Sequence, residues 1–164
     1  MALTTNYQLA EACAKYNIPL VGVFSKNDMP RKIDVGGYIV NLSDSHDEDG
    51  KPLPGTHWVS FFIERTKRGH MRAVYFDPFG VVPPVSVQRF LASMRPYPYC
   101  SFNVQNINSG VCGYYAVEFL WFMSKNRLRY PDVDKRFEMF LDRYSYNPEQ
   151  NLRLLEGFLQ EIKT

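Results

Sequence analysis

The feature that most constrains the fold is an almost unbroken apolar run, Tyr114–Met123. A helix that is hydrophobic on every side must be covered by other elements all round, so this helix is expected at the centre of the fold. It begins near Cys112, where unpaired backbone N–H groups and the helix dipole favour a thiolate. Gly113 is expected to leave the backbone open to a substrate. On these local features alone, a structural cysteine remains the commoner interpretation.

Size and composition favour a single soluble domain over residues 1–164. Hydrophobic residues make up 45% of the 164 residues and aromatic residues 15%, which excludes a disordered chain. No stretch is long and apolar enough for a transmembrane helix, and the N-terminal residues do not resemble a secretory signal. The expected location is therefore intracellular or within a particle.

Charge and cysteine content exclude further classes. The formal net charge of +2 is too small to indicate a nucleic-acid-binding protein, and the basic clusters at residues 65–72 and 125–129 are interpreted as solvated surfaces. Three widely spaced cysteines (Cys13, Cys100 and Cys112) fit neither a disulfide framework nor a zinc site. No metal or other cofactor is expected.

Hydrophobic periodicity predicts an α+β fold in which helices flank a mostly antiparallel sheet. The first helix is capped by Thr4 or Thr5. Two β-rich runs around the glycine-containing turn TKRGH predict an antiparallel hairpin. The expected helices cover residues 4–17, 83–96, 131–144 and 148–162, and a further one starts near Cys112 and contains the apolar run 114–123. The expected extended segments cover residues 21–30, 36–43, 57–65, 71–79 and 99–107.

A cysteine nucleophile needs a base, and His57 is the best of three histidines. His46 lies in the acidic loop of residues 43–55, whose carboxylates do not match the spacing of a calcium-binding loop. His70 lies in the predicted hairpin turn, which is a solvent position. His57 instead opens a strand after a flexible Gly-Thr pair and can point into a cleft while Trp58 packs on the opposite face.

Asp77 and Gln105 complete a set that is compatible with acyl transfer. Asp77 ends the second hairpin strand, so the hairpin places it beside His57, where it can orient an imidazole base. A turn-forming aspartate before Pro78 is an equally good interpretation of Asp77 alone. Gln105 ends the next predicted strand, seven residues before Cys112, and its amide can donate to an oxyanion together with the Cys112 backbone N–H. A lone strand-end glutamine is more often a surface residue.

Three separated motifs in the same order resemble the adenovirus-type cysteine endopeptidases. They are GTHW (55–58), FDPFG (76–80) and VQNINSGVCG (104–113), and residues 9–30 resemble the first helix and strand of that family. Relatives occur in virophages and Maverick/Polinton elements, and the papain-like fold is shared with the SUMO- and ubiquitin-like-protein proteases. The resemblance implies a single protease domain with a nucleophile at the start of a central helix.

The resemblance also implies roles for individual residues. They are a triad of His57, Asp77 and Cys112, with Gln105 and the Cys112 amide as the oxyanion hole. Adenoviral enzymes have glutamate as the third member, whereas Asp77 matches the cellular SUMO-protease branch. Those enzymes are stimulated by DNA and by a viral peptide that forms a disulfide. Cys100 lies in a different context, YPYCSF, so the resemblance does not extend this attachment to it.

The implied function is cleavage of capsid or other virion precursor proteins at small residues, by a monomer in the virion and the infected cell. Protein substrates are the expected partners, and activation by a peptide or by DNA stays open. Two other functions remain: a protease for SUMO- or ubiquitin-like modifiers that uses the same residues, and a non-catalytic binding module on the same fold.

Overall fold

A four-stranded mixed sheet forms the centre of the molecule. The computed structural model describes residues 3, 5–43, 48–50, 57–106 and 110–163. The strands lie in the sheet in sequence order, and they are β1 (Leu20–Ser25), β2 (Gly36–Asn41), β3 (Trp58–Arg65) and β4 (Met71–Phe76). The β2–β3 and β3–β4 pairs are antiparallel, which confirms a mostly antiparallel sheet and the predicted hairpin.

The β1–β2 pair is parallel, so the turn expected between these two segments is instead a crossover. Residues 26–35 carry the chain back across the sheet, because parallel neighbours cannot be joined by a tight turn. Gly36 has a φ of +129°, and its position against the Pro19 backbone leaves no room for a side chain. Glycine therefore allows β2 to start close beside the chain that enters β1.

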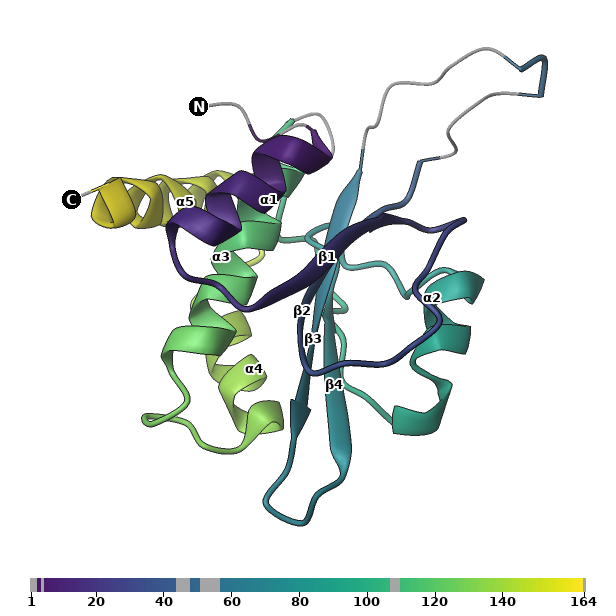
Figure 1. Cartoon of the computed structure of the whole chain (residues 1–164). Coiled ribbons are helices and arrows are strands. Elements are labelled where there is room, and N and C mark those ends of the chain that lie inside the picture. The colour runs from purple at the N-terminus through teal and green to yellow at the C-terminus, as the bar shows by residue number, and fades with distance from the viewer. Residues whose placement is uncertain (1–2, 4, 44–47, 51–56, 107–109, 164) are drawn as a thin grey trace.

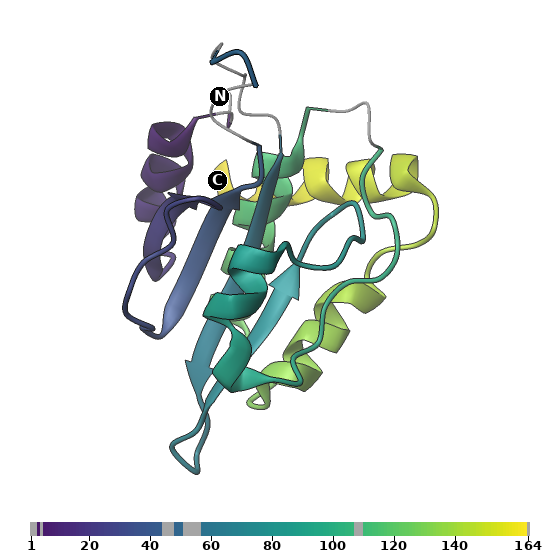
Figure 2. The ribbon, with the colours of Figure 1, turned by 90° about the vertical axis from the view of Figure 1, so that its right-hand side faces the viewer.

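Helices cover both faces of the sheet (Figure 1). On one face, α3 lies against the strands with α1, α4 and α5 around it, and on the other face lie α2 and the short 3₁₀ helix that follows it (Figure 2). The helices are α1 (Asn6–Lys15), α2 (Val85–Phe90), η1 (Ala92–Met94), α3 (Cys112–Lys125), α4 (Val133–Asp142) and α5 (Pro148–Lys163). The predicted α+β class is therefore confirmed.

Local signals account for the helix ends. Thr5, one of the two expected caps, accepts a hydrogen bond from the Gln8 N–H, and the Gln8 side chain accepts one from the Thr5 N–H. This reciprocal pair satisfies two of the N–H groups that a helix start leaves unpaired. Asp132 caps α4 by accepting from the Lys135 N–H. The expected helix of residues 83–96 is split, because α2 ends at Phe90 and the chain tightens into η1.

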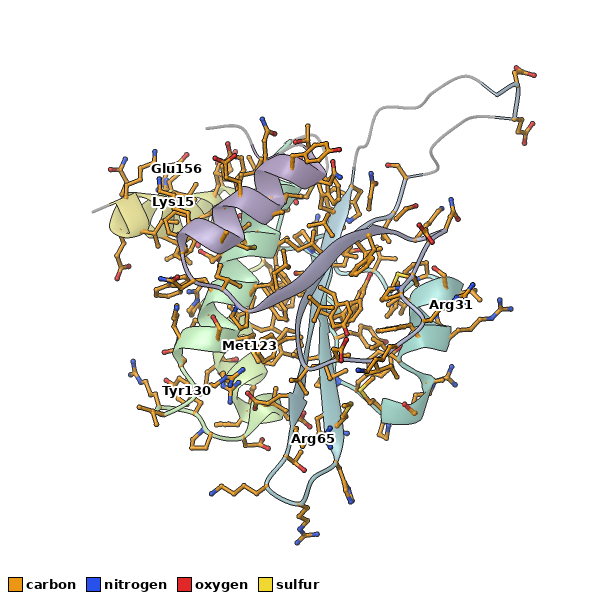
Figure 3. The ribbon with its side chains drawn as sticks, in the orientation of Figure 1. Lys15, Arg31, Arg65, Met123, Tyr130 and Glu156 are labelled. Carbon is orange, nitrogen blue, oxygen red and sulfur yellow. The ribbon has the colours of Figure 1, made fainter. Side chains whose placement is uncertain are left out.

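The core has two parts, one on each face of the sheet. The larger part contains almost the whole of α3, whose Phe119 packs with Phe76 and whose Phe119 and Phe122 both pack with Phe140. The smaller part lies under α2 and contains Tyr38 stacked on Phe61. The dense side-chain layer on both sides of the strands is visible in Figure 3, where Met123 marks the α3 side and Arg65 lies toward the hairpin end.

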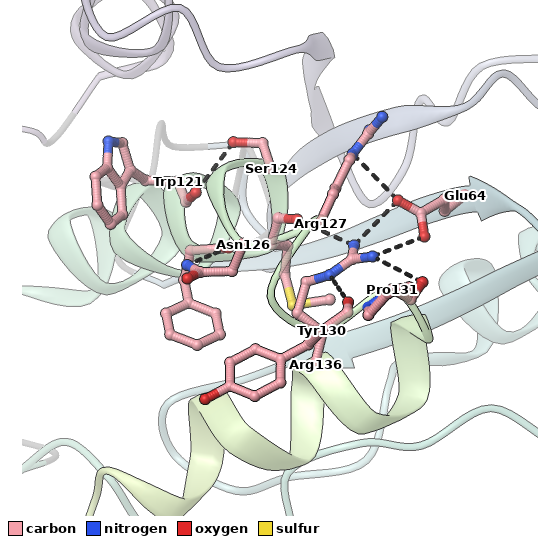
Figure 4. Close-up of polar contacts among 10 residues, drawn as sticks. Glu64, Trp121, Ser124, Asn126, Arg127, Tyr130, Pro131 and Arg136 are labelled. Atoms are coloured by element: carbon pink, nitrogen blue, oxygen red, sulfur yellow. Dashed lines mark hydrogen bonds and ion pairs between the residues drawn. The ribbon is translucent and has the colours of Figure 1, made fainter.

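A buried arginine ties α4 to the sheet (Figure 4). Arg136 is 1% exposed, and its guanidinium donates to both carboxylate oxygens of Glu64 on β3, at 3.0 and 3.1 Å. It also donates to the backbone carbonyls of Met123, Tyr130 and Pro131. A buried charge is tolerated only when it is paired and hydrogen-bonded, and this one is both.

The strand expected at residues 99–107 is wrong for the residues that the structure describes. Only one isolated parallel bridge, between Tyr75 and Tyr99, joins this segment to β4. After this bridge, the Val104 and Gln105 N–H groups both donate to the carbonyl of Pro78, whereas neighbouring residues in a strand point their N–H groups in opposite directions. Residue 107 lies outside the described residues. In the part of the chain that the structure describes, no helix is long and apolar enough to cross a membrane.

Candidate active site

The β3–β4 hairpin brings His57 and Asp77 together. Extending the register beyond the Ser60–Phe76 pair places His57 opposite Phe79 and near Asp77. The His57 backbone carbonyl accepts from the Leu42 N–H, which continues the β2–β3 ladder by one bond and fixes the start of β3. His57 Nε2 lies 2.8 Å from Asp77 Oδ1, so the contact expected from the hairpin is present.

Asp77 both starts a turn and faces the imidazole. Its carboxylate is buried and accepts from the Phe79 N–H at 2.8 Å, while its backbone carbonyl accepts from the Gly80 N–H. The two alternatives left open by the sequence are therefore compatible. The Phe79 ring then stacks on the His57 ring, with centroids 4.1 Å apart and an interplanar angle of 7°. This stack and the Asp77 hydrogen bond fix the orientation of the imidazole.

The surroundings of His57 favour its protonated form. Burial alone lowers the pKa of the ring, but the hydrogen bonds and charges of Asp77 and Cys112 raise it more, to about 9. The Nδ1 atom is buried and lies on the other side of the ring from the nitrogen that contacts Asp77. Since Nε2 faces Asp77, Nδ1 is the ring nitrogen available for proton transfer with the thiol.

Cys112 is the first residue of α3, as the sequence predicts. Its Sγ accepts a hydrogen bond from the Trp58 backbone N–H at 3.4 Å, within the range for a sulfur acceptor. This donor was missed by the sequence reasoning, although it belongs to the residue that directly follows His57. The hydrogen bond fixes the position of the sulfur beside the start of β3.

The space beside Gly113 is filled by the protein itself. The backbone carbonyl of Leu3 lies where a side chain at position 113 would have to be placed. The expectation that Gly113 admits a substrate is therefore wrong. Its missing side chain instead allows the backbone of Leu3 to lie against the start of α3.

Gln105 is buried, at 1% exposure, rather than a surface residue. Its backbone N–H donates to the Pro78 carbonyl at 2.9 Å, and the Val104 N–H donates to the same oxygen at 2.8 Å. The segment that carries Gln105 is thus attached to the turn that carries Asp77. Gly80, at a φ of +74°, closes this turn against the backbone of Phe102, and a side chain at position 80 would overlap that backbone.

The other two cysteines are in poor positions for nucleophilic chemistry. Burial raises the pKa of Cys13 to about 12 and that of Cys100 to about 11. The Cys100 thiol donates to the Phe102 carbonyl and is fully buried.

Other sequence candidates lie away from these residues or outside the described part. His46 and most of the acidic loop are outside the described residues, and His70 is exposed at the opposite end of the hairpin from His57. A cavity of about 570 Å³ lies at that far end, between the hairpin tip and the start of α4. No group of three or more histidine, cysteine or acidic side chains within the described residues could hold a metal ion.

Comparisons with known proteins give fold-level similarities at low identity. No protein-family model matches the chain, and no curated protein matches it. Among solved structures, it is similar to the crystal structure of the ASFV pS273R protease, with 17% identity and a TM-score of 0.49 over 82% of this chain and 58% of that one. It is also similar to HopZ1a in complex with IP6, with 14% identity and a TM-score of 0.47 over 82% of this chain and 52% of that one.

The chain therefore spans between about half and three-fifths of the length of these two proteins. At this level of similarity the comparisons assign no activity, and function has to be argued from the geometry of the site.

Proposed function

We propose that the chain is a cysteine endopeptidase of the adenovirus type, with Cys112 as nucleophile and His57 as its base. The observation that carries this proposal is the arrangement around one thiol. Cys112 Sγ lies at the start of a buried helix and accepts a hydrogen bond from the Trp58 N–H. Cys112 also raises the pKa of the His57 imidazole, whose Nε2 is hydrogen-bonded to the buried carboxylate of Asp77. A nucleophile, a base and an orienting group in this relation form the general arrangement for covalent acyl transfer.

The residues suggest the following steps. The thiolate of Cys112, paired with protonated His57, attacks the carbonyl carbon of a peptide bond and forms a tetrahedral oxyanion. His57 gives its proton to the departing amine, which leaves a thioester on Cys112. His57 then takes a proton from water, which attacks the thioester and releases the acid and the free thiolate–imidazolium pair. Asp77 keeps the imidazole oriented in each step.

Gln105 and the Cys112 backbone N–H are proposed as the oxyanion donors. Gln105 is buried beside the Asp77 turn and Cys112 begins a helix, where the first N–H groups have no partner within the helix. Removal of one such donor typically lowers the rate of acyl transfer by ~10²–10³.

The substrates proposed are capsid or other virion precursor proteins, cleaved at small residues in the virion and the infected cell by a monomeric single-domain enzyme. This part rests on the resemblance of the GTHW, FDPFG and VQNINSGVCG motifs to the adenovirus-type enzymes. Activation by a peptide or by DNA belongs to the same resemblance. No cofactor is required by the proposed steps.

A second candidate is a protease for SUMO- or ubiquitin-like modifiers, which one residue favours. Aspartate is the third triad member in that cellular branch, where adenoviral enzymes have glutamate. The Asp77 carboxylate lies within hydrogen-bond distance of His57 without the additional methylene of a glutamate. Incubation with a SUMO precursor separates the two candidates, since cleavage of the precursor after its glycine pair favours the modifier protease.

The test of the main proposal uses a substrate mixture that covers many cleavage motifs at once. The protein and its Cys112→Ala variant are incubated with a peptide library made from a whole proteome, and new termini are read by mass spectrometry. Cleavage next to small residues that disappears in the variant supports the endopeptidase.

A thiol label supplies the second measurement. Iodoacetamide at pH 8 should modify Cys112 before Cys13 and Cys100, because burial raises the pKa of both other thiols. No cleavage together with no preference for Cys112 would refute the proposal and favour a binding module.

A further inference from the structure

The proposed oxyanion donor lies on a segment that the sheet does not hold. After the bridge at Tyr99, the described residues 101–106 form no further pairing with a strand. An oxyanion donor is effective only when it is already in position before the reaction, because its orientation then costs nothing in the transition state. The contacts that hold the backbone at Gln105 are therefore part of how the site would work.

One peptide plane, between Val104 and Gln105, is held from both sides. Its N–H belongs to Gln105 and donates to the carbonyl of Pro78 at 2.9 Å. Its C=O belongs to Val104 and accepts from the side-chain amide of Asn151 at 3.0 Å. Because these two groups point in opposite directions from a rigid plane, the two hydrogen bonds together fix the rotation of the plane. That rotation sets the direction in which the Gln105 side chain leaves the backbone.

Asn151 is itself fixed. It lies in α5, is fully buried, and uses its amide nitrogen for a second bond to the Ser145 carbonyl at 2.8 Å. Its Oδ1 accepts from the Ser145 N–H at 2.9 Å. The side chain therefore bridges the corner before α5 and the segment that carries Gln105.

A buried asparagine is an unusual choice for packing alone. Most of the other described buried residues of the helical layer are apolar, and α5 itself contributes Leu155 and Phe158 to that layer. An amide at this position is explained by the carbonyl of Val104, which would otherwise be buried without this donor.

We infer that Asn151 is a positioning residue that sets the orientation of the Gln105 amide for oxyanion stabilisation. The inference rests on the proposed acyl transfer at Cys112. It adds α5, which begins 43 residues after Gln105, to the groups on which the chemistry depends.

The test compares two reactions of the same thiol. p-Nitrophenyl acetate acylates Cys112 through an oxyanion, whereas iodoacetamide alkylates it by direct displacement without one. Asn151→Asp keeps the shape and the acceptor for the Ser145 N–H but cannot donate to the carbonyls of Val104 and Ser145. The expected result is a fall of about tenfold or more in acylation, with alkylation unchanged. Gln105→Ala should lower acylation by ~10²–10³ and also leave alkylation unchanged.

Two further variants separate positioning from general destabilisation. Cys112 in the double variant of Asn151→Asp and Gln105→Ala should be acylated no more slowly than in Gln105→Ala alone, because the side-chain amide that Asn151 would orient is then absent. Leu155→Ala, a buried apolar change one turn further along α5, should lower thermal stability and leave the acylation rate of the folded protein unchanged. If circular dichroism shows that Asn151→Asp does not fold, Asn151→Ser replaces it. The serine side chain is too short to donate to the Val104 carbonyl, and it places no carboxylate in the buried site.

The outcomes distinguish this inference from the proposed function. Acylation of wild type no faster than that of Cys112→Ala overturns the proposed function and the inference with it. Wild-type acylation that depends on Cys112 but not on Asn151, or not on Gln105, overturns the inference alone. The same holds if alkylation falls in parallel, if the double variant loses a further tenfold, or if Leu155→Ala slows acylation as much as Asn151→Asp.

Discussion

Replacement of Asp77 by Asn tests the electrostatic basis of the site. The pKa of His57 is about 9 instead of the ordinary 6.5. Burial lowers it, and Asp77 and Cys112 together more than reverse that effect, with Asp77 2.8 Å away. At about 1.36 kcal/mol per pH unit, this difference favours the protonated ring by about 3 kcal/mol. Asp77→Asn keeps the shape but removes the charge, so the pKa of His57 should fall toward 6.5.

The same change has a defined effect on stability. A histidine whose pKa is raised by folding stabilises the folded protein fully below its unfolded pKa of about 6.5, and this contribution disappears as the pH rises through about 9. The difference in unfolding free energy between wild type and Asp77→Asn should therefore be larger at pH 6.5 than at pH 9.5, and a return of the His57 pKa to 6.5 would correspond to about 3 kcal/mol. Contributions from other titrating groups cancel in this difference when they lie far from Asp77.

Two measurements check the prediction. The His57 ring signal is followed by NMR between pH 5 and 11, and is assigned with a His57→Gln variant. Urea unfolding at pH 6.5 and 9.5 gives the free energies. Asp134→Asn is the matched control, because this aspartate pairs with Arg72 at the other end of the molecule's hairpin. A His57 midpoint that stays near 9 in Asp77→Asn, or a stability difference that does not change with pH, would refute the reasoning.

Three further substitutions address the fold around the site, each measured by reversible unfolding. Gly80→Ala should cost about 1–3 kcal/mol, because alanine is strained at a φ of +74° and its methyl group would overlap the backbone at Phe102; an unchanged stability contradicts this. Arg136→Ala should cost about 3–5 kcal/mol by breaking the buried pair with Glu64, and a loss below 1 kcal/mol would argue against the pair. Burial raises the pKa of Glu118 to about 7, so wild type should lose stability as the pH rises from 4.5 through about 7. Glu118→Gln should not show this loss, and equal pH profiles of stability for the two proteins would count against the prediction.

The parts of the fold that the sequence predicts are those with local signals. The apolar run of α3, the Thr5 cap and the glycine-containing turn between β3 and β4 each act within a few residues, and each element is present where it was expected. The proximity of His57 and Asp77 follows from the hairpin alone, because an antiparallel pair places the start of one strand beside the end of the next. The catalytic roles of these residues remain proposals.

Two of the wrong expectations share a physical cause, which is that the outcome depends on how segments pack and not on the residues of one segment alone. The β1 and β2 segments look alike whether they pair parallel or antiparallel, and only the crossover of residues 26–35 distinguishes the two arrangements. Gly113 was expected to admit a substrate, but the carbonyl of Leu3, more than a hundred residues earlier, fills the space. A glycine indicates that another group approaches the backbone closely, but the neighbouring sequence does not identify that group.

The position of Gln105 shows why the site as a whole is harder to predict than its individual members. A strand at residues 99–107 would have held Gln105 by a ladder, whose bonds follow from strand pairing alone. The described residues instead hold it through the turn at Pro78 on one side and through Asn151 on the other. Neither contact has a local signature, because a proline carbonyl and a helical asparagine are ordinary features of any chain. The hairpin pair is thus specified within some twenty residues, whereas the backbone at Gln105, the proposed oxyanion donor, is held in part by a residue of α5.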